Sequence, residues 1–395
     1  MSGPLKGIKV VSFEQVLSGP YAAMLLADLG ADVIKVEQPG KGDGARYNHP
    51  LIGDMSSYFL SVNRGKKSIT VNTKSEKGVD IIKKLLPQTD ILIENFRPGV
   101  MKRMGLDYEV SKTINSQLIY LSLSGFGQYG PNSPRPVYDM VAQAVGGAVS
   151  ITGEPNRPCV RVGYSIGDIG AALFAINATL AALYERQHSG QGQHIDISMT
   201  DCQVALCENA CARYFASGEI AKPLGGRHPI HTPFQIFPTN TDDMVVVAHR
   251  GKYWKKLCDI IGRPDLANDP RFKDGAIRIE NHNVLETILV KAFKTKTRDE
   301  WFKIFYENKM IYGAVNNIEQ VVTDPHFNER QMFVEVQHPR LGKLKVVGTP
   351  MKFSRTSCQI EKASPDLGEH TEEVLREKLN LNREEISNLR SEGVI

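Results

Sequence analysis

The sequence GIKVVSFEQVLSGPYAAMLLADLGADVIKVE, residues 7–37, decides the fold class. The apolar segments 7–13 and 31–37 predict two buried strands, and segment 19–29 between them predicts a helix with Pro20 in its first turn. A strand, a helix and a second strand of these lengths form a parallel βαβ unit. The sequence therefore predicts an α/β fold with an open Rossmann-like parallel sheet, which binds ligands at the carboxyl ends of its strands.

The same alternation continues beyond this unit. Residues 68–72, 90–94 and 118–123 predict further strands, and a helix capped near Ser75 follows the first of them. An enzyme that binds a dinucleotide is the main alternative for such a fold. The turn after the first strand, VLSGP, lacks the G-x-G-x-x-G pattern, which argues against NAD binding.

A break in this alternation predicts the domain organisation. A chain of 395 residues is long for a single core. After Met199 we expect one helix that runs to about Gly218, where the strand and helix alternation stops. We therefore predict a large domain over residues 1–218, a smaller α+β domain over 219–323, and a C-terminal segment over 324–395.

Composition excludes several classes of function. The net charge of +4 is small and scattered, so nucleic acid is not an expected partner. The N-terminus leads directly into the first strand, so we expect no signal peptide, and no apolar stretch approaches the ~18 residues that span a bilayer. These features predict a protein of the cytoplasm or, in a eukaryote, of the mitochondrial or peroxisomal matrix. Six cysteines form no C-x-x-C pair, and we expect no metal site.

A candidate catalytic residue lies in VRVGYSIGDIGAALFAINATLAALYERQHSGQGQHIDISMTD, residues 160–201. Asp168 is predicted to lie in the first turn of a long helix, where free N–H groups and the macrodipole should keep its carboxylate ionised. Gly167 and Gly170 would let a substrate carbonyl or another backbone segment come close. The alternative is that Asp168 only caps this helix.

This segment resembles the signature of the family III CoA-transferases, the family of formyl-CoA and carnitine CoA-transferases, and the resemblance covers essentially the whole chain. It implies that Asp168 is the nucleophile and that Gln15 lies in the active site. It also implies that the loop with Gly225 and Gly226 lies over the nucleophile and protects the reactive intermediate. The resembled family returns its C-terminal segment to the large domain and forms homodimers of interlocked rings.

The binding of CoA is predicted from two loops. Residues 63–74 and 94–105 combine cations with glycine or an aromatic ring, which suits phosphate groups and a purine. The resemblance then implies a set of CoA contacts at Val16, Val71, Lys74, Asn95, Phe96, Arg97, Arg103, Met104, Tyr138 and Asp139. It implies no permanently bound cofactor, because CoA and acyl-CoA are substrates.

Two other functions remain to be weighed. The α-methylacyl-CoA racemases resemble this chain throughout, but they carry a histidine where Tyr138 stands here. A racemase needs proton carriers on both faces of the substrate α-carbon, and a tyrosine with a pKa near 10 suits that role poorly. A CoA-binding protein without catalytic activity is the third hypothesis.

We therefore predict an enzyme that moves CoA from an acyl-CoA to a free carboxylic acid, through an anhydride and a thioester on Asp168. The segments LGGRHPIHTPFQIF and YGAVNNIEQVVTDPHF resemble the subgroup that uses succinate, glutarate or oxalate. Arg227 and His228 would then pair with the second carboxylate. His228 and His231 could also be metal ligands or general bases, although a loop histidine beside proline usually serves hydrogen bonding or packing.

Overall fold

The computed structural model of the chain describes residues 3–358 and 360–395. It divides into two compact units. The first contains the residues up to Val149, Arg161–Ile220 and Pro325–Ile395, and the second contains Ser150–Val160 and Ala221–Asp324. The second unit thus takes in residues 150–160, which the sequence analysis assigned to the large domain.

A six-stranded parallel sheet forms the centre of the first unit, as the sequence predicts. Its strands are β1 (Lys9–Phe13), β2 (Asp32–Glu37), β5 (Lys67–Thr70), β6 (Ile91–Glu94), β7 (Ile119–Ser124) and β8 (His194–Ser198). They are arranged in the order β5-β2-β1-β6-β7-β8. The strand order reverses between β1 and β6, and ligands bind at this switch point in open parallel sheets.

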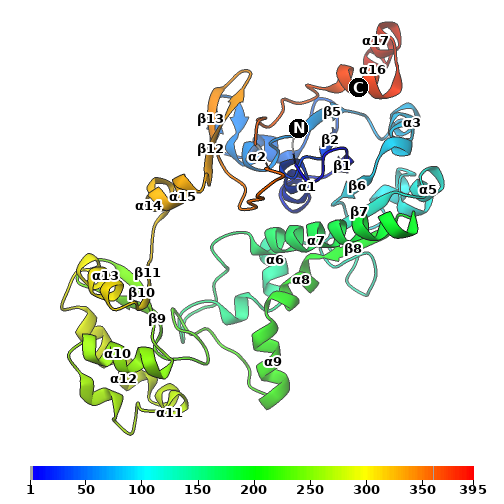
Figure 1. Cartoon of the computed structure of the whole chain (residues 1–395). Helices are drawn as coiled ribbons and strands as arrows, with labels where there is room; N and C mark the ends of the chain where they lie inside the picture. Colours follow the sequence, from blue (N-terminus) through cyan, green and yellow to red (C-terminus); the bar gives the residue numbers. More distant parts are fainter. Residues whose placement is uncertain (1–2, 359) are drawn as a thin grey trace. The chain divides into compact units, whose positions relative to one another are not determined.

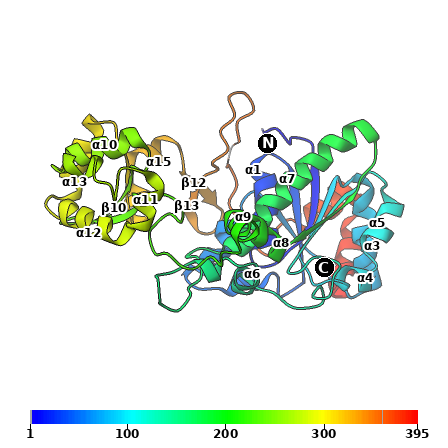
Figure 2. The same cartoon turned by 90° about the horizontal axis from the view of Figure 1, so that it is seen from below.

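Helices cover both faces of this sheet (Figure 2). One face carries α1 (Ser18–Asp28) and α7 (Ile166–Ser189), and the other carries α3 (Glu76–Leu85), α5 (Tyr108–Ile114), α16 (Thr371–Leu379) and α17 (Arg383–Ser391). The central strands β1 and β7 are buried along nearly their whole length, as expected for a parallel sheet covered on both faces, whereas the edge strand β8 is only partly buried. At the start of α3 the Ser75 side chain accepts the Gly78 N–H, so the predicted cap is confirmed.

The last residues of the chain complete the edge of this sheet (Figure 1). Thr70 N–H donates to Thr371 Oγ1 at 3.0 Å, and Asn72 N–H donates to the carbonyl of Val394 at 2.7 Å. Val374 and Leu375 lie in the apolar core on that face. The C-terminal segment is therefore packed into the first unit through both backbone and side-chain contacts.

Helix α7 corrects one expectation. By length and composition it is apolar enough to cross a membrane, with a mean hydropathy of 1.7, so the prediction that no stretch approaches that length was wrong. Half of the apolar window is buried, because one side of α7 packs on α1 and on the sheet. This is the behaviour of a core helix in a soluble protein.

The remaining elements of the first unit lie around the sheet. They are β3 (Leu51–Ile52), β4 (Met55–Ser56), α2 (Ser57–Val62), α4 (Val100–Arg103), α6 (Asp139–Val145), α8 (Met199–Leu206), α9 (Glu208–Ser217), α15 (Pro325–Glu329), β12 (Phe333–His338) and β13 (Gly342–Val347), with short 3-10 turns at Gly44–Tyr47 and Leu86–Gln88. The single helix predicted after Met199 was wrong. Cys207 leaves the helical conformation, with ψ of 20°, and separates α8 from α9.

The second unit is built on an antiparallel sheet of β11 (Ile311–Ala314), β10 (Asp243–Val247) and β9 (Phe234–Pro238). Its helices are α10 (Gly251–Ile260), α11 (Gly275–Glu280), α12 (His282–Phe293), α13 (Arg298–Glu307) and α14 (Ile318–Thr323), with a 3-10 turn at Pro264–Ala267. Trp254, Phe293 and Trp301 lie at the centre of its own apolar core. This unit therefore has the core that an independent domain needs.

Candidate active site

The site begins where β1 and β6 end, at the switch point of the parallel sheet. The Asn95 side chain joins the two loops that follow these strands. Its Oδ1 accepts the Gln15 N–H at 2.8 Å, and its Nδ2 donates to the Gln15 carbonyl at 2.9 Å and to Ser18 Oγ at 3.3 Å. The absence of a side chain at Gly19 allows this contact, since a Cβ there would lie 2.9 Å from Asn95 Cγ.

Asp168 is the third residue of α7 and lines a pocket of about 240 Å³ at this place. The N-cap residue is Ser165, so the interpretation of Asp168 as a mere cap does not hold. The capping carboxylate comes from another helix. Asp139 Oδ1 accepts the N–H of Gly167 at 2.8 Å and that of Asp168 at 3.4 Å.

Both glycines beside Asp168 are needed for close packing. A Cβ on Gly167 would lie 2.8 Å from the carbonyl oxygen of Asp139, and a Cβ on Gly170 would lie 2.9 Å from Leu206. The sequence suggested that these glycines let either a substrate carbonyl or another segment of the chain come close. The structure shows the approach of other segments of the chain. Gly167 lets the carboxylate of Asp139 approach the start of α7, and Gly170 lets the Leu206 side chain pack there.

The protonation of Asp168 differs from the expectation. Burial, and after it the negative charge of Asp139, raise its pKa, hydrogen bonds from the Ser18 hydroxyl and N–H lower it, and the net result is a pKa of about 7. The prediction that the helix N-terminus keeps this carboxylate ionised was therefore wrong. Near neutral pH the group is divided between its two forms, because desolvation disfavours the charged one.

Ser18 is a residue that the sequence analysis missed. It is almost fully buried at the start of α1, and its hydroxyl receives a hydrogen bond from Asn95 while donating to Asp168. The signal was present in the sequence, because the turn VLSGP follows the first strand and must lie at the ligand-binding end of the sheet. That turn argues against NAD binding and contains the predicted CoA contact Val16, but its serine was not among the predicted site residues.

Half of the predicted CoA contacts, and the predicted active-site residue Gln15, line this pocket. Gln15, Val16, Asn95, Phe96, Arg97 and Tyr138 are part of the wall together with Asp168. Arg135 and Met199 are also in the wall and were not predicted. Asp139, which was predicted as a CoA contact, is not part of this wall. Its carboxylate instead accepts hydrogen bonds from the first residues of α7.

The other predicted contacts extend along the same edge of the sheet. A second pocket of about 150 Å³ contains Gln15, Val71, Lys74, Phe96 and Met104. It is followed by an open depression lined by Lys74, Lys83, Lys102, Arg103 and Met104. Gln15 and Phe96 belong to the first two sites, and Lys74 and Met104 to the last two. The predicted residues thus form one continuous strip that leads from Asp168 to a cluster of cations.

The predicted glycine loop belongs to the second unit. Gly225 has a positive φ of 61° and donates its N–H to the carbonyl of Gly153 at 2.8 Å. A Cβ on Gly225 would lie 2.6 Å from the Glu154 carboxylate, and one on Gly226 would lie 3.0 Å from Ile236. These contacts explain why glycine is required here within the second unit. The predicted role of the loop over Asp168 stays a prediction.

The two loop histidines pack against other rings. The rings of His228 and His231 are stacked at 4.8 Å, His228 also stacks on Phe234 at 4.7 Å, and His231 on His249 at 4.2 Å. Across residues 3–358 and 360–395, no group of three or more His, Cys, Asp or Glu side chains is placed to hold a metal ion. The stack favours the packing interpretation of these histidines.

Fold and site together define a class of protein, an α/β enzyme with a buried carboxylate at the switch point of its sheet and a strip of pockets that leads from it to a cluster of cations. The chain belongs to CoA-transferase family III, whose model matches residues 5–371. It is therefore a CoA-transferase, and the members of its family act on acyl-CoA substrates.

Individual relatives are similar over nearly the whole chain. The succinyl-CoA:glutarate CoA-transferase of Homo sapiens is 38% identical over 99% of this chain and 90% of its own length. The acetyl-CoA:oxalate CoA-transferase of Acetobacter aceti is 38% identical over 89% of this chain and 90% of its own length. The crystal structure of a CAIB/BAIF family protein from Brucella suis has a TM-score of 0.86 and 35% identity, over 96% of this chain and all of that one.

Proposed function

We propose that this enzyme transfers CoA from an acyl-CoA donor, such as succinyl-CoA or acetyl-CoA, to a small dicarboxylic acid, with Asp168 as the nucleophile. The observation that carries the proposal is the position of Asp168, which lines a pocket at one end of the strip that leads to a cluster of cations. The relatives named above act on glutarate or oxalate, which supports a dicarboxylate as acceptor.

The reaction exchanges one thioester for another and needs no net proton. A carboxylate oxygen of Asp168 attacks the thioester carbonyl, the C–S bond breaks, and CoA leaves as a thiolate from a mixed anhydride. The thiolate then attacks the Asp168 carbonyl, which releases the donor acid and leaves an aspartyl-CoA thioester. The acceptor carboxylate attacks that thioester, and the thiolate returns to the acyl carbonyl of the new anhydride, so acyl-CoA leaves and Asp168 is regenerated.

The environment of Asp168 suits this chemistry. A carboxylate with a pKa of about 7 is more basic than an exposed aspartate, and this favours its attack on a carbonyl once it is ionised. The two hydrogen bonds from Ser18 stabilise the ionised form and fix its direction. Burial also keeps water from the anhydride, which would otherwise hydrolyse.

The tetrahedral intermediates need donors for a developing oxyanion. The N–H groups of Gly167 and Asp168 are already bound to Asp139, and that of Ile169 donates to the carbonyl of Ser165. These groups at the start of α7 are therefore engaged. In the predicted glycine loop the Gly225 N–H is bound to the Gly153 carbonyl, so we assign an oxyanion donor to the N–H of Gly226, where one well-placed donor contributes roughly 3–4 kcal/mol.

The strip beside Asp168 would bind CoA. Lys74, Arg97 and Arg103 supply positive charge for its phosphates, and Phe96 supplies an aromatic face for its base. Val16, Val71, Asn95, Met104 and Tyr138 form the remaining predicted walls. Asp139 contributes by fixing the start of α7, which carries the nucleophile.

Racemisation is less well supported. Among the described residues, the wall of the Asp168 pocket contains no histidine. Tyr138 is part of this wall, and its side chain is exposed. A proton carrier for the second face of an α-carbon is therefore lacking in this wall. Deuterium exchange into the α-carbon of an acyl-CoA, measured without a free acid, would separate this activity from transfer.

A second copy of the chain is the proposed partner. Helices α6 to α9 expose many large apolar side chains, among them Met140, Val145, Leu173, Val204, Leu206 and Phe215. Such a surface is rarely left in contact with water in a soluble monomer. We propose that two copies of the chain form a homodimer of interlocked rings. We also propose that the enzyme is located in the cytoplasm.

The second carboxylate of the acceptor is assigned to Arg227 and His228. Among the described residues Arg227 forms no ion pair with a carboxylate, and its charge lowers the pKa of the His282 imidazole, after the larger effect of burial. A guanidinium without a charged partner is suited to a carboxylate. A preference for monocarboxylic acids in a substrate screen would contradict this assignment.

The decisive experiment is to trap the covalent intermediate. The enzyme is mixed with succinyl-CoA, acetyl-CoA or other donors, quenched with hydroxylamine, digested, and examined by mass spectrometry. A hydroxamate on the peptide that contains Asp168 is expected, and the productive donor defines the substrate class. Asp168→Ala is the control, which should bind CoA normally and give neither adduct nor transfer. Substantial turnover by that variant would remove Asp168 from the role.

A further inference from the structure

The loop that contacts Asp168 has a strained backbone. Val16 lies between β1 and α1 with a φ of 65°, a left-handed conformation that is rare for a β-branched residue. Such a conformation persists only where the surrounding structure fixes it, and it is concentrated at functional sites. Two residues further on, Ser18 donates both of its hydrogen bonds to Asp168. Whatever fixes Val16 therefore also fixes the donors at Ser18.

Asp43 is the side chain that holds Val16. Its Oδ1 accepts the Val16 N–H at 3.1 Å and the Ala45 N–H at 2.9 Å. Asp43 is 1% exposed, so water does not replace these contacts. Burial opposes its charged form, but the charge of Lys35 and these N–H groups outweigh burial and hold the pKa of Asp43 below its usual value. The group that accepts the Val16 N–H is thus an ionised carboxylate.

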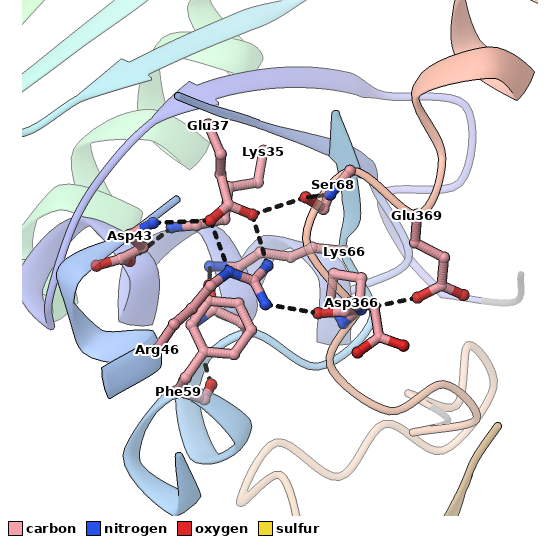
Figure 3. A network of polar contacts seen from close by, with 12 residues as sticks. Lys35, Glu37, Asp43, Arg46, Phe59, Lys66, Ser68, Asp366 and Glu369 are labelled. Atoms are coloured by element: carbon pink, nitrogen blue, oxygen red, sulfur yellow. Dashed lines mark hydrogen bonds and ion pairs between the residues drawn. The ribbon is translucent and has the colours of Figure 1, made fainter. Parts of the chain in front are cut away.

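Lys35 ties this carboxylate to the other end of the loop. Its buried Nζ donates to Asp43 Oδ2 at 2.9 Å, to the Glu14 carbonyl at 2.8 Å and to the Glu14 carboxylate at 2.5 Å. Figure 3 shows Lys35, Asp43 and Glu37 side by side, and Asp43 N–H donates to Glu37 Oε2 at 2.9 Å. Lys66 also donates to Glu14, at 2.8 Å. The loop therefore starts from a residue bound by two buried lysines and is held in its middle by Asp43.

We propose that Asp43 is a positioning residue for the transfer reaction: by holding the left-handed Val16, it keeps the Ser18 hydroxyl and N–H directed at Asp168. The inference rests on the proposed role of Asp168 as the nucleophile. Asp43 lies in the wall of the neighbouring pocket of about 150 Å³ but not in that of the pocket that contains Asp168, so it acts on Asp168 through the backbone. Asn95 holds the same loop from the opposite side, at Gln15 and Ser18.

The test compares Asp43→Ala with variants that separate positioning from stability. Asp28→Asn is the matched control, because Asp28 is also buried and paired with a buried cation, Arg64, but does not contact the loop. Asp43→Asn is the conservative variant, since its amide oxygen still accepts the Val16 N–H. Val16→Gly removes the strain, because glycine adopts a positive φ without a steric clash. It serves as the second mutation of a double-mutant cycle.

We expect Asp43→Ala to lower kcat at least tenfold, while KM for acyl-CoA changes less than threefold and Asp43→Asn recovers part of the loss. Without the Ser18 hydrogen bonds the pKa of Asp168 rises, so the acidic limb of the pH–rate profile moves to higher pH. Asp139, Tyr58, the pocket residue Tyr138 and the pocket cations Arg97 and Arg135 are the charged or titratable groups around Asp168, and all remain in these variants. In the Val16→Gly background the effect of Asp43→Ala should shrink severalfold.

Two results would overturn the proposal. One is an Asp43→Ala enzyme that loses thermal stability as Asp28→Asn does but keeps the kcat and pH profile of the wild type. The other is an effect of Asp43→Ala that is unchanged in the Val16→Gly background. Wild-type enzyme that forms no Asp168 hydroxamate would contradict the proposed function itself, so the two failures are distinguishable.

Discussion

Asp139 accepts the backbone N–H of Gly167 at 2.8 Å, so a carboxylate from α6 caps the helix that carries Asp168. The same oxygen is 3.4 Å from the Asp168 nitrogen. One negative charge therefore serves two purposes. It satisfies donors at the start of α7, and it raises the pKa of the neighbouring Asp168, whose pKa burial has already raised.

The rate of covalent adduct formation should increase with pH through about 7. Only the ionised form of Asp168 attacks, and its pKa is about 7, so the rate should be low at pH 5.5 and level off above pH 8. Asp139→Asn removes the like charge but keeps an oxygen that accepts the Gly167 N–H. Its acidic limb should move to lower pH. Rapid-quench measurement of the aspartyl adduct checks both profiles.

Asp139→Ala provides the matching control, because it removes the charge and the cap together. Loss of a helix cap costs roughly 0.5–2 kcal/mol, so this variant should be less stable than Asp139→Asn. A wild-type profile that does not change between pH 5.5 and 8, with chemistry shown to limit the rate, would contradict the assignment.

Gly167→Ala should reduce activity at least tenfold, although alanine favours helices. Its Cβ would lie 2.8 Å from the Asp139 carbonyl oxygen and 2.9 Å from Asp139 Oδ1, so α6 or α7 must shift. Overpacking of this kind costs about 1–3 kcal/mol, more than the gain of about 1 kcal/mol from helix propensity. Thermal unfolding and kcat are the measurements.

Gly251→Ala is the comparison for that variant. Gly251 is the first residue of α10, and no atom lies within 4 Å of the position of an added Cβ. This substitution should leave stability unchanged or raise it slightly. Equal behaviour of the two alanine variants would show that close packing at Gly167 has no consequence.

Glu94→Gln should stabilise the protein at pH 8 but have little effect at pH 5. Burial raises the pKa of Glu94, hydrogen bonds from Ser122 and from the Phe96 N–H offset part of this effect, and the net pKa is about 7. A folded-state pKa above the unfolded value gives stability that is complete below pH ~4.5 and is lost as pH rises through 7. The loss is on the order of 3 kcal/mol for this shift.

Urea unfolding at both pH values measures this effect. The amide oxygen of the glutamine still accepts the Phe96 N–H, so we expect a gain of about 1–3 kcal/mol at pH 8. Glu335→Gln is the control, because Glu335 lies in an exposed pair with Lys343 and should change stability by less than ~1 kcal/mol. A Glu94 variant that is less stable than the wild type at pH 8 would contradict the prediction.

The sequence predicted the parallel sheet, and the structure confirms it. The strands β1 and β2 lie within one or two residues of the predicted ranges, because runs of β-branched residues buried on both faces are easy to recognise. The family was also visible in residues 160–201, and the match to residues 5–371 confirms it. The end of α8 at Cys207 was not predictable, because helical sequence continues through it.

The candidate site was predictable as a set of segments. The turn after β1, the loop after β6 and the start of α7 follow from the rule that parallel strands present their carboxyl ends at one edge. The partners within the site were not. Ser18, Asn95 and Asp168 are far apart in the sequence, and only their packing shows that Asn95 supports the serine that donates to the aspartate.

The sequence by itself determined the α/β fold, the family and the residue at the start of the long helix, because these depend on local periodicity and on a recognisable segment. Only the tertiary structure decided the state of that residue. The pKa of Asp168 reflects burial, the charge of Asp139 and two hydrogen bonds from Ser18. Desolvation and electrostatic interactions depend on which groups become neighbours, and folding brings these groups together from separate segments of the chain.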